Sequence, residues 1–254
     1  MKKLMKSCII AFAMYSKIPM PRTDWDKENM KYALCFFPLV GAVIGGLTYL
    51  FGRYGHCIAG DGAFFTILWM MIPILVTGGI HVDGLLDTAD ALSSYKPKEE
   101  KLKILKDSHA GAFAIIVGIC YFFLQFGAYS ELTEEMLPVL AFSFILSRSL
   151  SALAVVTFKM AKNTGLAATF SEMALKKRVQ MVMVVFIIFS TAAMMMAHPL
   201  FGTCAAAIAF LNFFYYRHMA YKKFGGVTGD LAGFYLQTSE LLMVIIMVFA
   251  NYMR

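Results

Sequence analysis

Three closely spaced aspartates have the clearest capacity for chemistry in this sequence. Asp83, Asp87 and Asp90 stand at positions i, i+4 and i+7 of an otherwise apolar stretch. On an α-helix, which turns about 100° per residue, all three carboxylates point from one face. Carboxylates this close repel one another in a partly dry site, and a divalent cation removes the repulsion. Oxygen donors alone favour Mg²⁺ or Mn²⁺ over Zn²⁺. The alternative to a metal site is a solvated acidic helix face that binds no ligand.

Further polar groups stand beside apolar stretches, where charge is costly and often functional. His81 precedes Asp83 by two residues and could act as a base or support a metal ligand. Arg148 is surrounded by apolar residues, so it needs an acidic side chain or a substrate phosphate as its partner. A late glycine-rich segment exposes backbone N–H groups suited to phosphate. Candidates for phosphate contact are Lys106, Asp107, Ser108, Thr228, Gly229 and Glu240, and Asp230 is a candidate base or ligand.

Two of these assignments have simple alternatives. The glycines before Thr228 could form an ordinary turn, and the lysines near Lys106 could anchor the chain to anionic lipid.

The composition places these residues in a membrane protein. Hydrophobic residues make up 59% of the 254 residues and charged residues only 15%, whereas soluble domains have about 45–50% and about 25%. A membrane-spanning helix needs about 20 mainly apolar residues. We therefore expect one all-α domain over residues 1–254, a transmembrane bundle with spans at 32–52, 62–80, 111–129, 136–158, 179–197, 200–216 and 236–252.

The basic residues predict the orientation of these seven spans. With the N-terminus in the cytoplasm, the segments on that side are 1–31, 81–110, 159–178 and 217–235, and they hold 7, 5, 5 and 3 of the 23 Lys and Arg residues. Cytoplasmic loops carry such an excess of positive charge. The formal charge of +7 therefore reflects topology and contact with anionic lipid, and it does not indicate nucleic acid. The candidate groups, including the aspartates of the 81–110 loop, then reach the cytoplasmic side.

Local features add smaller expectations. The basic N-terminus and the apolar residues 7–15 lack a cleavage site and predict an interfacial or re-entrant helix. His198-Pro199 is short enough to join the fifth and sixth spans as a tight hairpin, and the five cysteines form no CxxC pair. Close helix approach is expected at Gly41, Gly45 and Gly46.

The motifs and their order resemble a known family. The run His81-Val-Asp83-Gly-Leu-Leu-Asp87-Thr-Ala-Asp90 looks like the HxDGLxDTxD motif of the cobalamin synthases, the adenosylcobinamide-GDP ribazoletransferases. Lys17 and His109 depart from the family pattern, which has arginine at both positions. Further similar elements occur in the expected order at Ser16–Pro19, Phe37–Gly41, Lys106–Gly111 and Gly226–Asp230 with Glu240.

The resemblance implies the reaction that completes the nucleotide loop of cobalamin. A ribose hydroxyl of α-ribazole, or of its 5′-phosphate, would attack the cobinamide-side phosphate of adenosylcobinamide-GDP. GMP would leave, and adenosylcobalamin or its 5′-phosphate would form. The implied roles are Mg²⁺ binding by the three aspartates, phosphate contact by Lys106 and Arg148, and orientation or deprotonation of the hydroxyl by Asp230 or His81.

The implied setting is the cytoplasmic membrane of a bacterium or archaeon, crossed several times. Other cobalamin-assembly enzymes are expected partners, together with the lipid bilayer and the two substrates. One alternative is a lipid synthase resembling the CDP-alcohol phosphatidyltransferases, but Asp87-Thr88 stands where that motif needs Ala-Arg. A cation transporter is the other, although only Glu240 lies well inside a predicted span.

Overall fold

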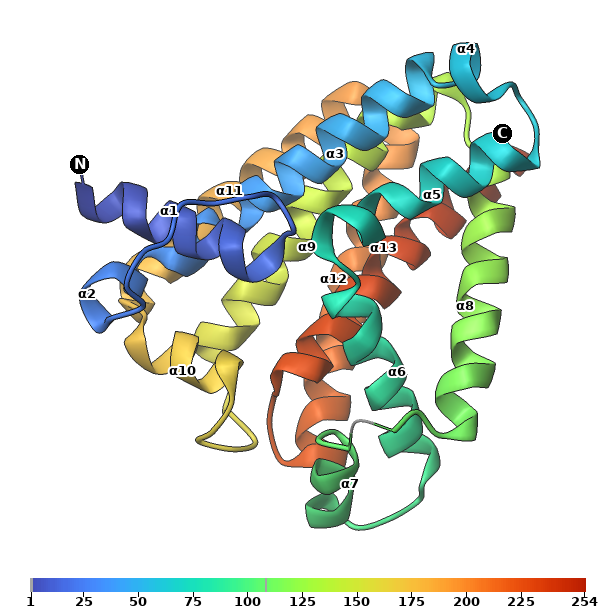
Figure 1. Ribbon diagram of the computed structural model, residues 1–254. Helices are drawn as coiled ribbons and strands as arrows, with labels where there is room; N and C mark the ends of the chain where they lie inside the picture. The colour runs from blue at the N-terminus through green and yellow to red at the C-terminus, as the bar shows by residue number, and fades with distance from the viewer. Residues whose placement is uncertain (1, 108) are drawn as a thin grey trace.

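The computed structural model describes residues 2–107 and 109–254, which form helices and no β-strand (Figure 1). Their order begins with a short N-terminal group, α1 (Lys2–Tyr15), α2 (Lys27–Met30) and η1 (Ala33–Phe36). The elements that follow are α3 (Phe37–Tyr54), α4 (His56–Ala59), α5 (Ala63–Thr77), α6 (Ile80–Ser93), α7 (Lys98–Ile104), α8 (Ala112–Ser130), η2 (Glu134–Met136), α9 (Leu137–Thr157), α10 (Leu166–Met173), α11 (Lys176–Ala197), α12 (Pro199–Phe224) and α13 (Gly229–Tyr252).

Six helical segments of the described chain are long and apolar enough to cross a membrane. The pair α5 and α6 makes a seventh if its two bent halves are counted as one span. The expected all-α bundle of about seven spans is therefore confirmed, as is the tight turn at His198 between α11 and α12. The predicted cytoplasmic location of the N-terminus stays a prediction.

Helix α9 occupies the centre of the bundle, where α3, α11 and α13 pack around it. A methyl group on Gly41 would collide with the Phe144 carbonyl, and one on Gly45 would collide with the Ala141 carbonyl. The missing side chains therefore let α3 lie directly on α9. The prediction of close approach is confirmed at these two positions and wrong for Gly46, which faces open space.

The basic segments gather towards one end of the molecule. In Figure 1, α2, α7 and α10 lie towards the lower left and bottom, away from α4 and the C-terminus at the upper right. Each of these three helices belongs to a different one of the segments rich in Lys and Arg. Their shared position is the one that the charge distribution predicts.

Three predicted boundaries need correction. The second span was expected to run through 62–80, but α5 ends at Thr77 and the chain bends by 93° into α6. The segment 81–110 is not an open loop, because α6 packs against α8 and α13 within the bundle. The last helix begins at Gly229 rather than at 236, so the residues of the late motif form its first turn.

The N-terminal helix α1 packs on α2, η1 and α3.

Candidate active site

Two adjacent glycines form the turn that sets the direction of α6. Gly78 and Gly79 have φ values of 66° and 79°, a left-handed conformation that glycine adopts without steric cost. The side chain of Lys17 packs directly on Gly78, and the Lys17 N–H donates to the Val76 carbonyl over 2.7 Å. The N-terminal element Ser16–Pro19, which resembles a family motif, therefore supports this turn through Lys17.

Glycines also bring α6 against α13. A methyl group on Gly84 would lie 2.6 Å from the Asp230 carbonyl oxygen, and one on Gly233 would lie 3.0 Å from the His81 carbonyl oxygen. The two backbones thus touch without intervening side chains. As a result, Asp83 and Asp87 on α6 stand beside Asp230 on α13, and the charges of Asp83 and Asp230 reach Asp87. Residues almost 150 positions apart in sequence form one acidic group.

Asp90 has a different setting from the other two aspartates of its motif. One carboxylate oxygen accepts the Gly111 N–H over 2.6 Å, and the other accepts the Ala114 N–H over 2.8 Å. The first N–H groups of a helix lack partners within that helix, so Asp90 caps α8 from a neighbouring helix. Glycine is needed at position 111 because a methyl group there would lie 2.7 Å from the carboxylate. The predicted metal contact of Asp90 is untested, but its oxygens already hold α6 to α8.

The late motif forms the start of α13 and fixes a second loop. Thr228 accepts the Leu231 N–H over 3.2 Å, which is an N-cap, and its hydroxyl donates to Asp230 over 3.4 Å. Val227 pairs with the loop that follows α9: its N–H donates to Lys159 over 2.9 Å and its carbonyl accepts from Ala161 over 2.9 Å. This pairing places the side chain of the next lysine in that loop, Lys162, near Asp230.

Two lysines lie near the acidic group, and the ammonium of one of them, Lys162, donates to the Leu102 carbonyl. Lys106, a predicted phosphate contact, and Lys162, which sequence reasoning missed, line the same cavity as Asp83 and Asp230. Burial lowers the pKa of the Lys162 ammonium, Lys106 lowers it further, and Asp230 raises it. Two ammonium groups on the wall of one cavity are suited to a ligand with several negative oxygens.

The neighbours of Lys106 are placed elsewhere. Asp107 is exposed and accepts hydrogen bonds from His109, which lower the pKa of Asp107. Neither residue of this pair lines the cavity, and Ser108 lies outside the described residues.

Arg148 forms an ion pair with an acidic side chain, Glu240. Its Nη1 lies 2.6 Å from Oε1 of Glu240, which also accepts from the Ser147 hydroxyl over 2.8 Å. Arg148 is fully buried, and the Phe37 ring that lies 6.0 Å from its guanidinium carbon is itself part of the cavity wall. The pair therefore stands one layer behind the cavity and joins α9 to α13. Of the two partners expected for Arg148, the structure shows the carboxylate.

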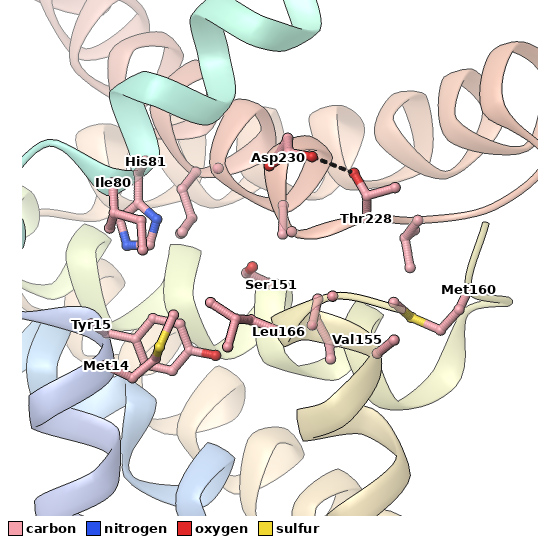
Figure 2. A pocket seen from close by; sticks show the side chains of 18 of the residues that line it. Met14, Tyr15, Ile80, His81, Ser151, Val155, Met160, Leu166, Thr228 and Asp230 are labelled. Atoms are coloured by element: carbon pink, nitrogen blue, oxygen red, sulfur yellow. Dashed lines mark hydrogen bonds between the residues drawn. The ribbon is translucent and has the colours of Figure 1, made fainter. Parts of the chain in front are cut away.

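One cavity of about 410 Å³ collects most of these groups. Figure 2 shows Met14 and Tyr15 reaching toward it from α1, with His81 and Asp230 on the opposite side. Its walls come from α1, η1, α3, α6, α9, α10 and α13 and from the loops before α8, α10 and α13. The predicted residues on its surface are His81, Asp83, Lys106, Thr228, Gly229 and Asp230.

His81 lines the cavity with a ring nitrogen that lacks a partner. The residue is 5% exposed, and its Nε2 finds no hydrogen-bond partner within the described chain. Its ring lies near those of Tyr15 and Phe37, with centroid separations of 6.4 Å and 6.0 Å. Buried polar atoms are normally paired, so the missing partner of this nitrogen makes His81 a candidate for contact with a molecule that enters the cavity.

The donor set fits Mg²⁺ better than a metal that needs a complete protein cage. No group of three His, Cys, Asp or Glu side chains in residues 2–107 and 109–254 is arranged to enclose an ion. Mg²⁺ is usually held by one or two carboxylates and completes its shell with water and substrate phosphate oxygens. Asp83 and Asp87, with Asp230 beside them, are carboxylates that could serve in this way, and Mg²⁺ binding stays a prediction.

Sequence reasoning missed two contributors to this cavity. Tyr15 ends α1, and Lys162 lies in a loop between two spans. Nothing in the local sequence distinguishes either from an anchoring aromatic or an anchoring lysine. The one available signal was the Gly165 that follows Lys162, because a polar loop with glycine next to a span is where a ligand is approached closely.

Comparison with known proteins shows which family the sequence matches. The family model described as Cobalamin-5-phosphate synthase matches residues 7–248. The chain is 46% identical over 249 residues to an adenosylcobinamide-GDP ribazoletransferase of Lachnoclostridium phytofermentans, covering 98% of this chain and 95% of the relative. Proteins of the same name from Clostridium botulinum strain Alaska E43 and Geobacillus thermodenitrificans are 33% and 30% identical over 248 and 251 residues, with at least 95% of each chain covered. No solved structure matches. These matches extend over nearly the whole chain and confirm the resemblance found in its motifs: the chain belongs to the cobalamin-5-phosphate synthase family.

Proposed function

We propose that this protein joins adenosylcobinamide-GDP to α-ribazole or α-ribazole 5′-phosphate and releases GMP. The observation that carries the proposal is the cavity whose walls hold both Asp83 and Asp230 and the lysines Lys106 and Lys162. Carboxylates and ammonium groups on the walls of one cavity suit a pyrophosphate ester with its counter-ion. The names of the relatives supply the identity of the two substrates.

In the proposed reaction a phosphorus–oxygen bond is exchanged. The acceptor hydroxyl oxygen forms a bond to the phosphorus on the cobinamide side, and the bond from that phosphorus to the bridging oxygen breaks. GMP leaves with the electron pair, and the hydroxyl proton passes to Asp230 or His81, both of which line the cavity. Lys106 and Lys162 neutralise the non-bridging oxygens, so negative charge on the reacting phosphates is stabilised.

Asp83 and Asp87 are the proposed Mg²⁺ ligands, and bound Mg²⁺ would supply further positive charge to the pyrophosphate oxygens. Three other predicted residues, Asp90, Arg148 and Glu240, hold this arrangement in place. Asp90 ties α6 to α8, and the Arg148–Glu240 pair ties α9 to α13. We therefore assign both to positioning, since both are already engaged by protein groups.

The test uses purified protein in lipid vesicles with adenosylcobinamide-GDP, α-ribazole and Mg²⁺. The expected products are GMP and a cobamide in equal amounts, both resolved by liquid chromatography and mass spectrometry. A parallel reaction with the 5′-phosphate identifies the preferred acceptor by comparison of kcat/KM. Release of GDP instead of GMP, or no cobamide from either acceptor, would contradict the proposal.

Two control reactions separate the rival functions. Incubation with a CDP-linked lipid and an alcohol should give no CMP, and vesicles should show no protein-dependent uptake of Mg²⁺. A lipid synthase or a transporter would give the opposite result in its own assay.

A further inference from the structure

The candidate cavity has two chemically different parts. Charged groups gather where α6 meets α13, at Asp83 and Asp230, and Lys106 and Lys162 line the same cavity, with Lys162 near Asp230. Away from these groups the wall is apolar and aromatic, with contributions from Met14, Tyr15, Leu34, Phe37, Val155 and Leu166. A cavity that served only a pyrophosphate would have no use for this second wall, because burying polar oxygens against it is unfavourable.

The apolar part presents flat rings. The Tyr15 and Phe37 centroids lie 4.2 Å apart, and Tyr15 is nearly parallel to His81, with an interplanar angle of 23°. Figure 2 shows Tyr15 and His81 on facing sides of this end of the cavity. Aromatic rings favour a second aromatic system over an aliphatic one, through stacked or edge-on contacts.

The unpaired His81 nitrogen stands at the border between the two parts. His81 is adjacent to the Asp83 end through the chain and adjacent to Tyr15 and Phe37 through its ring. Its buried Nε2 lacks a partner among the described residues, so a ligand hydroxyl that reached it would supply the missing hydrogen bond. A ligand with an aromatic body and a hydroxyl-bearing group would satisfy both features.

The size of the cavity restricts the ligand further. Its volume of about 410 Å³ lies at the small end of the range of about 300–1,000 Å³ typical of small-molecule sites. A nucleoside fits this space, whereas a corrin macrocycle with its side chains is several times larger than a nucleoside and must stay outside the walls described above.

We propose that the apolar part of the cavity binds the planar aromatic base of the ribonucleoside acceptor. Tyr15 and Phe37 then contact the base, and His81 Nε2 is hydrogen-bonded to a hydroxyl of the ribose. This inference rests on the proposed function and places its acceptor substrate in the apolar part of the cavity. Bound in this way, the ribose extends from the apolar end toward Asp230, where its hydroxyl meets the phosphate. The cavity thus distinguishes an aromatic riboside from ribose phosphate alone.

The experiment compares Tyr15→Leu with Tyr15→Phe. Leucine removes the ring but keeps an apolar side chain, so the KM for α-ribazole should rise about tenfold, the loss expected for one aromatic contact and the ring area buried with it. The KM for adenosylcobinamide-GDP should stay the same, and phenylalanine should restore the acceptor KM. Tyr54→Leu, at the exposed far end of α3, is the matched control.

A binding measurement separates this inference from the proposed function. Isothermal titration calorimetry of the protein with α-ribazole alone, without corrinoid or Mg²⁺, should show one site that weakens about tenfold in Tyr15→Leu. If GMP is released normally but Tyr15→Leu changes neither the acceptor KM nor this affinity, the assignment of the base is wrong and the function stands. If α-ribazole binds with the expected dependence on Tyr15 but no GMP forms, the site stands and the proposed reaction fails.

Discussion

Replacing Gly84 with alanine should reduce turnover about a hundredfold without unfolding the protein. The added methyl would lie 2.6 Å from the Asp230 carbonyl oxygen, whereas ordinary contact begins at 3.4 Å. Both atoms belong to packed helices, so α6 and α13 must separate by about 0.8 Å, the difference between these distances. A shift of about 1 Å at a reacting centre can cost about 10²-fold in rate. Asp83 and Asp87 would move with α6, away from Asp230.

The assay is kcat for GMP release by the purified variant, with thermal unfolding measured in the same detergent. Alanine is the better helix former by about 1 kcal/mol, so loss of activity cannot come from a weaker helix. Gly127→Ala is the matched control, since this glycine lies within α8 and nothing stands within 4 Å of the added methyl. A folded Gly84→Ala variant with the kcat of the unmodified protein would refute the reasoning that contact between these backbones positions the site.

Three further predictions concern the residues around the cavity. Glu240→Ala leaves Arg148 buried without its partner and should lower the free energy of unfolding by about 3–5 kcal/mol, seen as a reduced midpoint in denaturant; an unchanged midpoint would contradict the buried pair. Asp90→Ala should cost about 1–2 kcal/mol of cap energy, whereas Asp90→Asn keeps an acceptor oxygen and most of the stability; equal loss of stability in both would argue against a cap. Cys57, exposed in α4, should react in intact cells with a membrane-impermeant maleimide, and protection until lysis would reverse the predicted orientation.

The sequence was sufficient for the features that depend on local pattern. Apolar length predicted the spans, basic residues predicted which loops share an end, and the i, i+4 spacing placed Asp83 and Asp87 on one side of α6. Each of these follows from a periodicity or a composition that acts within a few turns of helix. The motif resemblance agreed with them because it rests on the same short segments.

Contacts between residues far apart in the sequence could not be predicted from these local patterns. Asp90 has the same spacing signal as Asp87, yet its oxygens are taken by N–H groups of α8 more than twenty residues later. Lys162 and Tyr15 reach the cavity only because Val227 pairs with one loop and α1 folds back along α3. The bend at Gly78 could be suspected from two glycines, but its direction depends on what α6 packs against.

We propose that the reaction takes place where α6 meets α13, and the most direct test is the rate of GMP release by two charge-removing variants. Asp83→Asn and Asp230→Asn should each reduce kcat by at least about 10²-fold, the usual contribution of a metal ligand or general base. Asp61→Asn, in the exposed turn before α5, should match the unmodified protein. If both site variants fold, bind adenosylcobinamide-GDP and release GMP at the unmodified rate, the chemistry lies elsewhere in the bundle.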